Sequence, residues 1–176
     1  MSRFHTLGHS TRSFDELLEV LNQYEITLLA DVRSFPRSRT NPQFDRDRLT
    51  DRLPKHDISY EHIEDLGGYR DTDLSASPNA AWDNDSFRTY ADYALTEEFR
   101  TGLHELIALG ERFTVAYVCA EKVYWRCHRR IISDWLLVRD HEVVHIFEAD
   151  RTEAHSLTRF ATVANETVTY PESEGG

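Results

Sequence analysis

Two nearly continuous apolar runs of strand length, residues 26–32 and 113–118, most constrain what this chain can fold into. Such runs are typical of strands that are covered on both faces, as the strands of parallel sheets are. Shorter apolar segments at residues 4–7, 58–63 and 143–147 predict three further strands. The chain therefore needs helices on both sides of a sheet.

Helical patterns lie between these strands. Ser13-Phe-Asp-Glu16 has the form of a capping box and predicts the start of the first helix. Strands that alternate with helices predict an α/β fold, a single three-layer domain with a mainly parallel sheet and helices on both faces. We expect this domain to span residues 1–170, with a loose tail over 171–176. Further helices are predicted over residues 45–53, 87–95, 96–109 and 128–139, the third of them ending at Gly110.

The composition narrows the function classes. With 31 acidic and 20 basic residues the net charge is −11, which disfavours nonspecific binding to nucleic acid. Together with the near-absence of lysine, this charge suits a halophile's salt-rich cytoplasm, with a GC-rich genome as the alternative. The chain has no apolar run of about 18 residues and no signal-peptide profile, so we expect a cytoplasmic protein without a membrane partner. Two cysteines are too few for a disulfide scaffold and are expected to be thiols. No cofactor and no oligomeric state follow from the sequence.

Basic and small residues gather where the predicted strands end. In open α/β sheets, ligands bind outside the carboxyl ends of the strands. Arginine forks, backbone amides and glycine turns suit a small anionic or nucleotide-like ligand, although each arginine could instead pair with a surface carboxylate. The candidate binding residues, in chain order, are Ser10, Arg33, Arg37, Asn41, Gly67, Gly68, Arg70, Trp125, Arg126 and Arg129.

Cys127 is the candidate nucleophile. It lies near a predicted helix start beside His128 and two arginines, a setting that lowers a thiol pKa and favours the thiolate. Cys119 ends a buried strand, where a cysteine is often a small core residue. The two thiols could also form a reversible disulfide, or share a metal with a histidine. The spacing from Cys119 to Arg126 is one residue longer than in the Cys-x5-Arg loop of cysteine phosphatases, which argues against that class.

Other side chains could take part in catalysis. Glu121 is a candidate general base or carboxylate nucleophile, with the orientation of an arginine as the alternative. His9 and His128 are candidates for proton transfer. Aromatic residues that offer stacking surface or a lid, with core packing as the alternative, are Trp82, Tyr90, Tyr93 and Trp125.

Several motifs together resemble one family. They are Thr6-Leu-Gly-His-Ser-Thr-Arg12, Asp31-Val-Arg-Ser-Phe-Pro-Arg-Ser-Arg39, Leu66-Gly-Gly68, Cys119-Ala-Glu121 and Cys127-His-Arg129. With them the chain resembles the bacterial and archaeal family catalogued as domain of unknown function 488. The resemblance supports this choice of residues and implies no particular reaction. The loop between the cysteines reads Lys122-Val-Tyr-Trp where that family often has proline, and this departure leaves both thiols in place.

Three hypotheses follow. The leading one is an enzyme that acts on a phosphorylated or nucleotide-like small molecule, with Cys127 or Glu121 as the reacting group. The second is a thiol-based redox or metal-responsive binding protein that uses Cys119 and Cys127. The third is a nucleic-acid-processing accessory protein that holds a flipped base or strand end in the arginine-lined crevice.

Overall fold

The computed structural model describes residues 1–172, so the predicted tail over residues 171–176 lies outside the described residues from 173 on. Its main sheet has the strand order β3-β2-β4-β1-β5-β6, in which the first five strands run parallel and β6 pairs antiparallel with β5. This arrangement confirms the predicted, mainly parallel α/β sheet. The strands are β1 (Arg3–Gly8), β2 (Leu28–Asp31), β3 (Ser59–His62), β4 (Val115–Cys119), β5 (Glu142–Glu148) and β6 (Arg151–Ala154).

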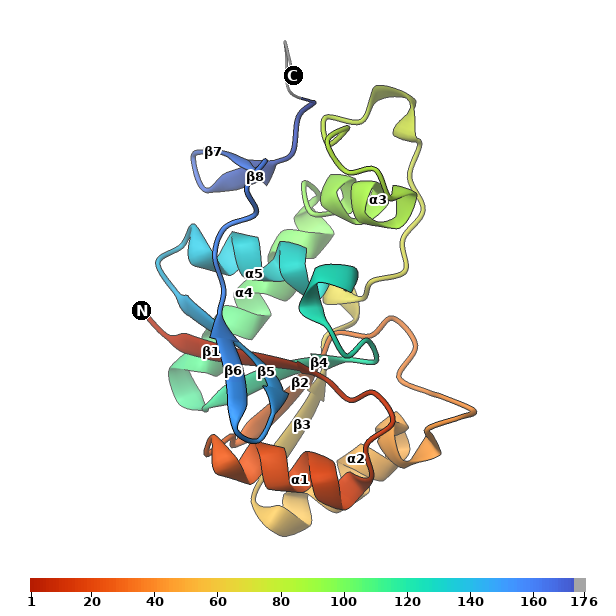
Figure 1. Cartoon of the computed structure of the whole chain (residues 1–176), viewed down its shortest axis with the longest axis vertical. Coiled ribbons are helices and arrows are strands. Elements are labelled where there is room, and N and C mark those ends of the chain that lie inside the picture. Colours follow the sequence, from red (N-terminus) through yellow and green to blue (C-terminus); the bar gives the residue numbers. More distant parts are fainter. Residues whose placement is uncertain (173–176) are drawn as a thin grey trace.

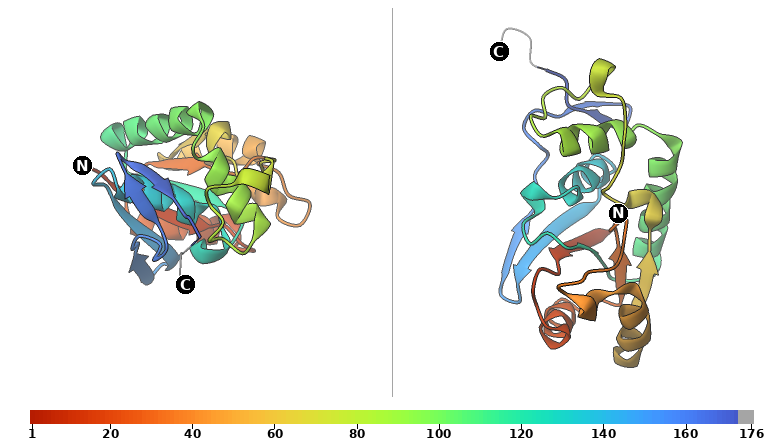
Figure 2. Two further views of the ribbon diagram at one scale, coloured as in Figure 1. Left: turned by 90° about the horizontal axis from the view of Figure 1, so that it is seen from above. Right: turned by 90° about the vertical axis from the view of Figure 1, so that its right-hand side faces the viewer.

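Helices cover both faces of the sheet (Figures 1 and 2). Helices α1 (Phe14–Gln23) and α2 (Arg46–Arg52) pack on one face against Leu29 and Val118. Helices α3 (Asp85–Tyr93), α4 (Glu97–Arg112) and α5 (Arg129–Leu137) pack against the opposite core, which includes Leu28 and Tyr117. Because successive strand residues point to opposite faces, one continuous apolar run supplies both cores. Short 3-10 turns are η1 (Pro42–Phe44), η2 (Leu53–His56), η3 (Glu64–Leu66), η4 (Leu74–Ala76) and η5 (Tyr124–Arg126).

Two local predictions meet different outcomes. The capping box is confirmed, because the Ser13 hydroxyl accepts from the Glu16 amide and the Glu16 carboxylate accepts from the Ser13 amide. The predicted end of α4 at Gly110 is wrong, because the helix continues to Arg112. A β-carbon at Gly110 would lie 2.5 Å from the Phe4 ring, so this glycine serves close packing and not helix termination.

The C-terminal part adds strands that the sequence analysis did not predict. Strand β5 is followed by β6 at the sheet edge, and a separate antiparallel hairpin joins β7 (Thr162–Ala164) to β8 (Thr167–Thr169). Each is only three or four residues long, and β6 is exposed throughout, so none has the apolar pattern of a buried strand. In Figure 1 the hairpin lies beyond α5, near α3.

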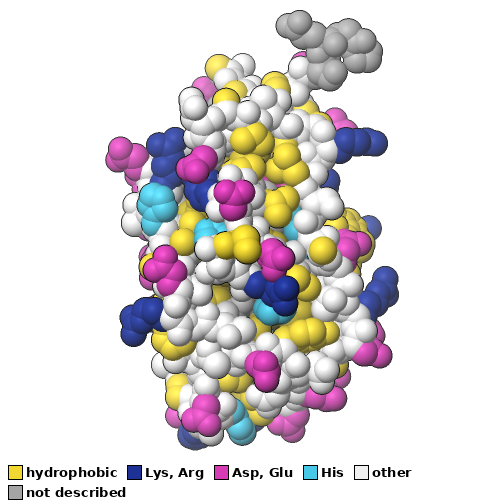
Figure 3. All heavy atoms as spheres, turned by 90° about the vertical axis from the view of Figure 1, so that its left-hand side faces the viewer, with side chains coloured by type: hydrophobic (Ala, Val, Ile, Leu, Met, Phe, Trp, Pro, Cys, Tyr) yellow, Lys and Arg dark blue, Asp and Glu magenta, His cyan; other side chains and the backbone are white. Residues whose placement is uncertain are grey.

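The surface mixes charges and carries few large apolar side chains. Figure 3 shows one face, on which acidic, basic and apolar side chains are interspersed. Among the described residues no helix has both the length and the apolar character needed to cross a bilayer. The exposed large apolar residues include Phe35 and Tyr69, which follow β2 and β3 and lie near one another.

The position of the predicted ligand crevice is set by the neighbouring strands β1 and β4. The chain leaves β1 toward α1 on one face and leaves β4 toward α5 on the other, which creates a crevice outside their carboxyl ends. The two loops stay joined, because the amide of His9 donates to the Cys119 carbonyl (2.8 Å). A β-carbon at Gly8 would lie 1.7 Å from the Glu121 carbonyl oxygen, so only glycine permits this approach.

Candidate thiol site

A pocket of about 570 Å³ opens at the carboxyl edge of the sheet. His9, Arg33, Gly68 and Cys127 line it from four separate turns, as the strand-end argument predicts. The start of α3 contributes a further wall. The remaining lining residues are Ser34, Phe35, Arg37, Ser38, Tyr69, Asn84, Ser86, Phe87, Cys119, Ala120, Glu121, Arg126 and His128.

The two cysteines meet at this pocket. Their sulfurs lie 2.6 Å apart, both residues are buried, and both are free thiols. The strand β4 delivers Cys119, and the turn before α5 brings Cys127 back beside it. The two sulfurs are therefore in direct contact, so the charge on one affects the ionisation of the other.

A buried guanidinium holds this pair. The Nε of Arg129 donates to the Cys119 sulfur (3.1 Å), and its backbone amide donates to the Cys127 sulfur (3.4 Å). The other guanidinium nitrogens donate to the Thr6 hydroxyl (2.8 Å) and the Glu121 carbonyl (2.7 Å). Arg129 is only 1% exposed, and no carboxylate of the described residues forms a hydrogen bond or ion pair with it.

This arrangement makes one sulfur anionic. An unpaired buried ion costs several kcal/mol, and a guanidinium does not deprotonate near neutral pH. Ionising an ordinary thiol at pH 7 costs only about 2 kcal/mol, because its pKa lies about 1.5 units higher. The second cost is smaller, so the structure favours a thiolate as the counter-ion of Arg129.

The two thiols differ in acidity. Burial opposes ionisation of Cys127, but the Cys119 thiol, the Arg129 charge and the Arg129 amide outweigh it and lower its pKa to about 6. Burial and the adjacent Cys127 sulfur raise the pKa of Cys119 well above its usual value. At neutral pH, Cys127 is therefore the thiolate and Cys119 donates its S–H to it.

His128 is placed to exchange a proton with Cys127. Its Nε2 donates to the Val32 carbonyl (2.7 Å), which leaves Nδ1 facing the Cys127 sulfur at 3.5 Å. Burial lowers the pKa of His128, so the ring is neutral and Nδ1 is a proton acceptor. A β-carbon at Gly68 would lie 2.5 Å from this nitrogen, so the glycine makes room for the ring.

His9 and Arg33 are held by a second buried cluster. Arg33 donates to both carboxylate oxygens of Asp31, and its Nη1 lies 3.3 Å from the Nε2 of His9. Burial and the Arg33 charge lower the pKa of His9 to about 4. The Arg33 charge is thus neutralised by Asp31, and His9 enters the pocket as a neutral ring.

The solvent-accessible charged groups of the pocket do not include the buried Arg33 and Arg129. Arg37, Arg126 and Glu121 line it and are exposed. Within residues 1–172, the side chains of all three are without a hydrogen bond or ion pair. These two arginines are therefore the cations that a ligand can reach.

Six predicted binding residues lie outside the pocket lining. Arg70 lies over the Tyr93 ring and donates to the carbonyls of Gly67 and Glu64, so it stabilises the glycine turn. Gly67 packs on Ser34. Arg129 lies behind the sulfurs, as described above. The others are Ser10, whose amide joins the β1 and β4 loops, Asn41, whose backbone amide donates to the Ser38 hydroxyl, and Trp125, which packs near Phe147.

Three of the aromatic residues predicted to offer stacking surface or a lid lie in the core instead. Tyr90 and Tyr93 are buried and donate to the carbonyls of Leu66 and Asp65, so they belong to the core and not to the pocket surface. Trp82 is buried against Phe87, Phe160 and Tyr170 and is not a lid.

Sequence reasoning missed the aromatic residues that do border the pocket, Phe35, Tyr69 and Phe87. Phe35 and Tyr69 directly follow Arg33-Ser34 and Gly67-Gly68, so their position after strand ends was the available signal. The predicted metal alternative also has no support in the geometry, because residues 1–172 contain no group of three or more His, Cys, Asp or Glu side chains placed to hold an ion.

The segment from Ser13 to Leu136, which carries both cysteines, matches the family model described as domain of unknown function DUF488. The chain belongs to the DUF488 family. No curated protein and no solved structure matches it. Family membership confirms the resemblance seen in the motifs, and the family description assigns no activity.

The role of Arg129 predicts how Cys127 reacts. In the wild-type protein, the rate of Cys127 alkylation by iodoacetamide should rise with a midpoint near pH 6, because only the thiolate reacts. Arg129→Lys loses the planar fork and should move the midpoint up by roughly one unit or more. Peptide mass spectrometry assigns each cysteine. Arg126→Lys is the matched control and should stay at the wild-type value, whereas a wild-type midpoint near that of free cysteine would contradict this account.

Proposed function

We propose that this DUF488 protein is an enzyme that binds a small molecule bearing a flat ring and an anionic group, and that reacts with it through the Cys127 thiolate. A phosphorylated or nucleotide-like molecule is the substrate class. The observation that carries the proposal is the buried Arg129, which is paired with two sulfurs on the wall of an open pocket. A thiolate stabilised in this way is a nucleophile at neutral pH.

The pocket mouth supports the ligand class. Phe35 and Tyr69 are 70% and 75% exposed, with ring centroids 5.9 Å apart. Large exposed rings beside a pocket offer stacking surface to a base or another flat ring. The unpaired Arg37 and Arg126 supply charge and planar hydrogen-bond donors for phosphate or carboxylate.

The chemistry proceeds in two stages. The Cys127 thiolate attacks an electrophilic carbon or phosphorus atom, a new bond to sulfur forms, and the leaving group departs with its bonding electron pair. Water then releases the adduct, with Glu121 accepting the water proton as general base, and Cys127 regains its charge. His128 takes up the thiol proton whenever Cys127 starts the cycle protonated.

Recognition and reactivity can be tested together with 4-(bromomethyl)benzoate, which has a flat ring, an anionic group and an electrophilic carbon. Cys127 displaces bromide as its sulfur–carbon bond forms. For Cys127, the rate of alkylation by 4-(bromomethyl)benzoate is divided by the rate with iodoacetamide, and the same ratio is measured for the glutathione thiol. The Cys127 ratio should be about tenfold higher, equivalent to about 1.4 kcal/mol of recognition. Phe35→Ala and Arg126→Gln should lower the ratio, and Val163→Ala, at an exposed position of β7, is the control. A ratio equal to that of glutathione would exclude recognition of this class.

Turnover is tested with a mixture of mononucleotides and sugar phosphates. Mass spectrometry should show consumption of at least one component by the wild-type protein. Cys127→Ser should lose this activity by roughly a thousandfold or more, the scale seen when a nucleophile is removed, while keeping the fold. Circular dichroism provides the folding control. Equal turnover by Cys127→Ser would remove the thiolate from the mechanism.

A second candidate function rests on the 2.6 Å between the sulfurs of Cys119 and Cys127. In this alternative the pair is a reversible redox couple, and a hydroperoxide is the oxidant. The Cys127 thiolate attacks one peroxide oxygen, the O–O bond breaks and its electron pair leaves with the other oxygen as an alcohol or water after protonation, and Cys127 becomes a sulfenic acid. The Cys119 thiol then attacks the Cys127 sulfur, water leaves and the disulfide forms. In a cytoplasmic location, small-molecule or protein thiols such as glutathione or thioredoxin would reduce the disulfide by exchange, and they would themselves be oxidised to disulfides.

Mild oxidation with hydrogen peroxide separates the two functions. A redox couple should lose two hydrogens in mass at stoichiometric peroxide and recover them with dithiothreitol. Cys119→Ser should instead accumulate an added oxygen on Cys127, because no second thiol resolves the sulfenic acid. Persistence of both free thiols in the oxidised wild-type protein would count against the redox alternative and leave the enzyme proposal standing.

A further inference from the structure

A buried hydrogen-bond chain continues inward from the thiol site. Nη1 of Arg129 donates to the Thr6 hydroxyl (2.8 Å), which lies 2.8 Å from Nδ1 of His145. Nε2 of His145 lies 2.8 Å from Nδ1 of His155, and Nε2 of His155 lies 2.7 Å from the Asp134 carboxylate. All five residues are buried. The chain thus links a buried cation to a buried anion through three side chains.

The donors of this chain run in one direction. A guanidinium can only donate, so the Thr6 hydroxyl accepts from Arg129 and is free to donate onward to His145. His145 then carries its proton on Nε2 and donates to His155, which in turn donates to Asp134. Burial is the largest cause that lowers the pKa of His145, to about 2, in agreement with a neutral ring.

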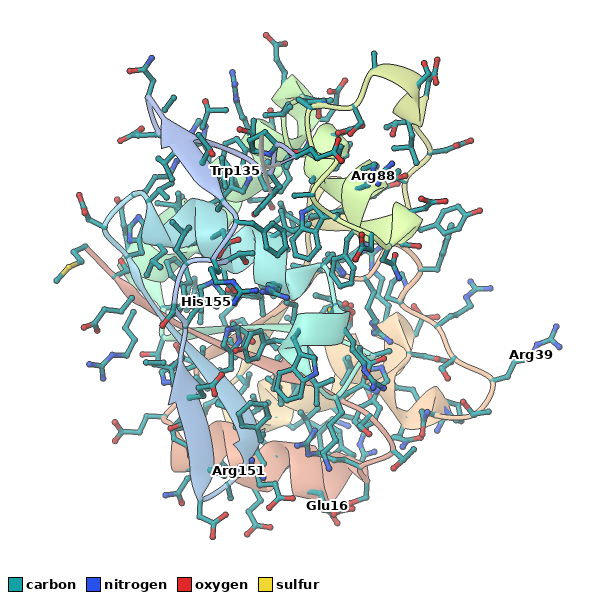
Figure 4. All side chains as sticks on the ribbon, turned by 45° about the horizontal axis from the view of Figure 1, so that its top comes forward. Glu16, Arg39, Arg88, Trp135, Arg151 and His155 are labelled. Atoms are coloured by element: carbon teal, nitrogen blue, oxygen red, sulfur yellow. The ribbon has the colours of Figure 1, made fainter. Side chains whose placement is uncertain are left out.

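The far end of the chain is firmly held. Asp134 accepts from the Thr158 amide (3.0 Å) and from the Tyr170 hydroxyl (2.7 Å), in addition to His155. Figure 4 labels His155, which lies between the C-terminal strands and α5. The ring of Tyr124 stacks on His145, with centroids 3.6 Å apart. This closed packing keeps water from substituting for members of the chain.

We propose that Asp134 is a positioning residue of the thiol site, acting through His155, His145 and Thr6 on Arg129. It supplies the buried negative charge that remains when Cys127 gives up its own charge to a substrate. The inference rests on the proposed function only in taking Cys127 as the reacting group. The chemistry of the substrate does not enter it.

The physical reason is the cost of a buried unpaired cation. While Cys127 is a thiolate, the sulfur pair carries a negative charge next to Arg129: the guanidinium Nε donates to the Cys119 sulfur, and the Arg129 backbone amide donates to the Cys127 sulfur. Once Cys127 is protonated, alkylated or bonded to a second sulfur, that charge is gone and the guanidinium is left with neutral partners. Polarised hydrogen bonds to Asp134 then lower the free energy of this neutral-sulfur state. The chain therefore makes the thiolate easier to convert, which a nucleophile requires.

Other charges around the chain lie at its edges. Glu153 accepts from the Tyr124 hydroxyl on the exposed side of the stacked ring, and Arg130 donates to the Thr158 hydroxyl. On the sulfur side the facing groups are His128 and the Glu121 carbonyl. The Glu121 carbonyl accepts from Arg129, whereas the side chains of Glu153, Arg130 and His128 form no hydrogen bond with it. Asp134 is therefore the carboxylate to which the hydrogen-bond chain from Arg129 leads.

Asp134→Asn tests the proposal by the pH midpoint of Cys127 alkylation with iodoacetamide. Loss of the remote anion destabilises the neutral-sulfur state, so the midpoint should move to lower pH by about half a unit to one unit, less than the shift from a charge in direct contact. A purely structural role would loosen Arg129 and move the midpoint upward. An unchanged or raised midpoint in folded Asp134→Asn would overturn the proposal.

Thr6 provides the second test and covers the case in which Asp134→Asn does not fold. Thr6→Val interrupts the chain but keeps both charges, and should shift the midpoint in the same direction. Thr6→Ser retains the hydroxyl and should match the wild type. Tyr170→Phe removes a hydrogen bond from Asp134 without its charge and serves as the packing control. A wild-type midpoint in Thr6→Val would show that the chain does not couple the two ends. Alkylation needs no substrate, so failure here is separate from failure of the proposed enzyme activity.

Discussion

The site depends on one buried guanidinium whose direct counter-ion is sulfur. The planar fork of Arg129 joins four parts of the chain, because it reaches Thr6 on β1, Cys119 on β4 and the Glu121 carbonyl in the following loop, while its backbone opens α5. A lysine has one nitrogen at the end of a flexible stem and could not hold all these acceptors. The need to balance a charge out of water therefore fixes both the geometry and the ionisation of the thiols.

The fold could be predicted from the sequence wherever buried apolar residues form a continuous run or recur at a regular spacing. Residues 26–32 and 113–118 were predicted to be strands covered on both faces, and they correspond to the neighbouring interior strands β2 and β4. The edge strand β6 and the hairpin of β7 and β8 were missed because each strand has only three or four residues and at most one of them is buried, which gives no apolar pattern. The order of the strands could not be predicted from local sequence patterns either, because it depends on where each connection between strands places the next strand in the sheet.

The candidate site was accessible for a different reason. Parallel strands end at one edge, so residues after each strand meet there, and His9, Arg33, Gly68 and Cys127 do line one pocket. The sequence did not show which arginines are already occupied. Arg33 is neutralised by Asp31, two residues before it, whereas Arg126 is without an ion pair among the described residues. The contact between Thr6 and His145 spans 139 residues, a separation at which no local pattern indicates a pair.

The positions of the arginines separate binding from activation. Arg37 and Arg126 are exposed at the pocket and can meet the anionic group of a ligand, whereas Arg129 is sealed behind the sulfurs. A ligand anion therefore cannot displace the thiolate from the cation that stabilises it. If a single exposed arginine served both purposes, substrate binding would draw that charge away and raise the pKa of the nucleophile. In the function proposed above, burial of Arg129 lets Cys127 keep its charge while a substrate is held in front of it.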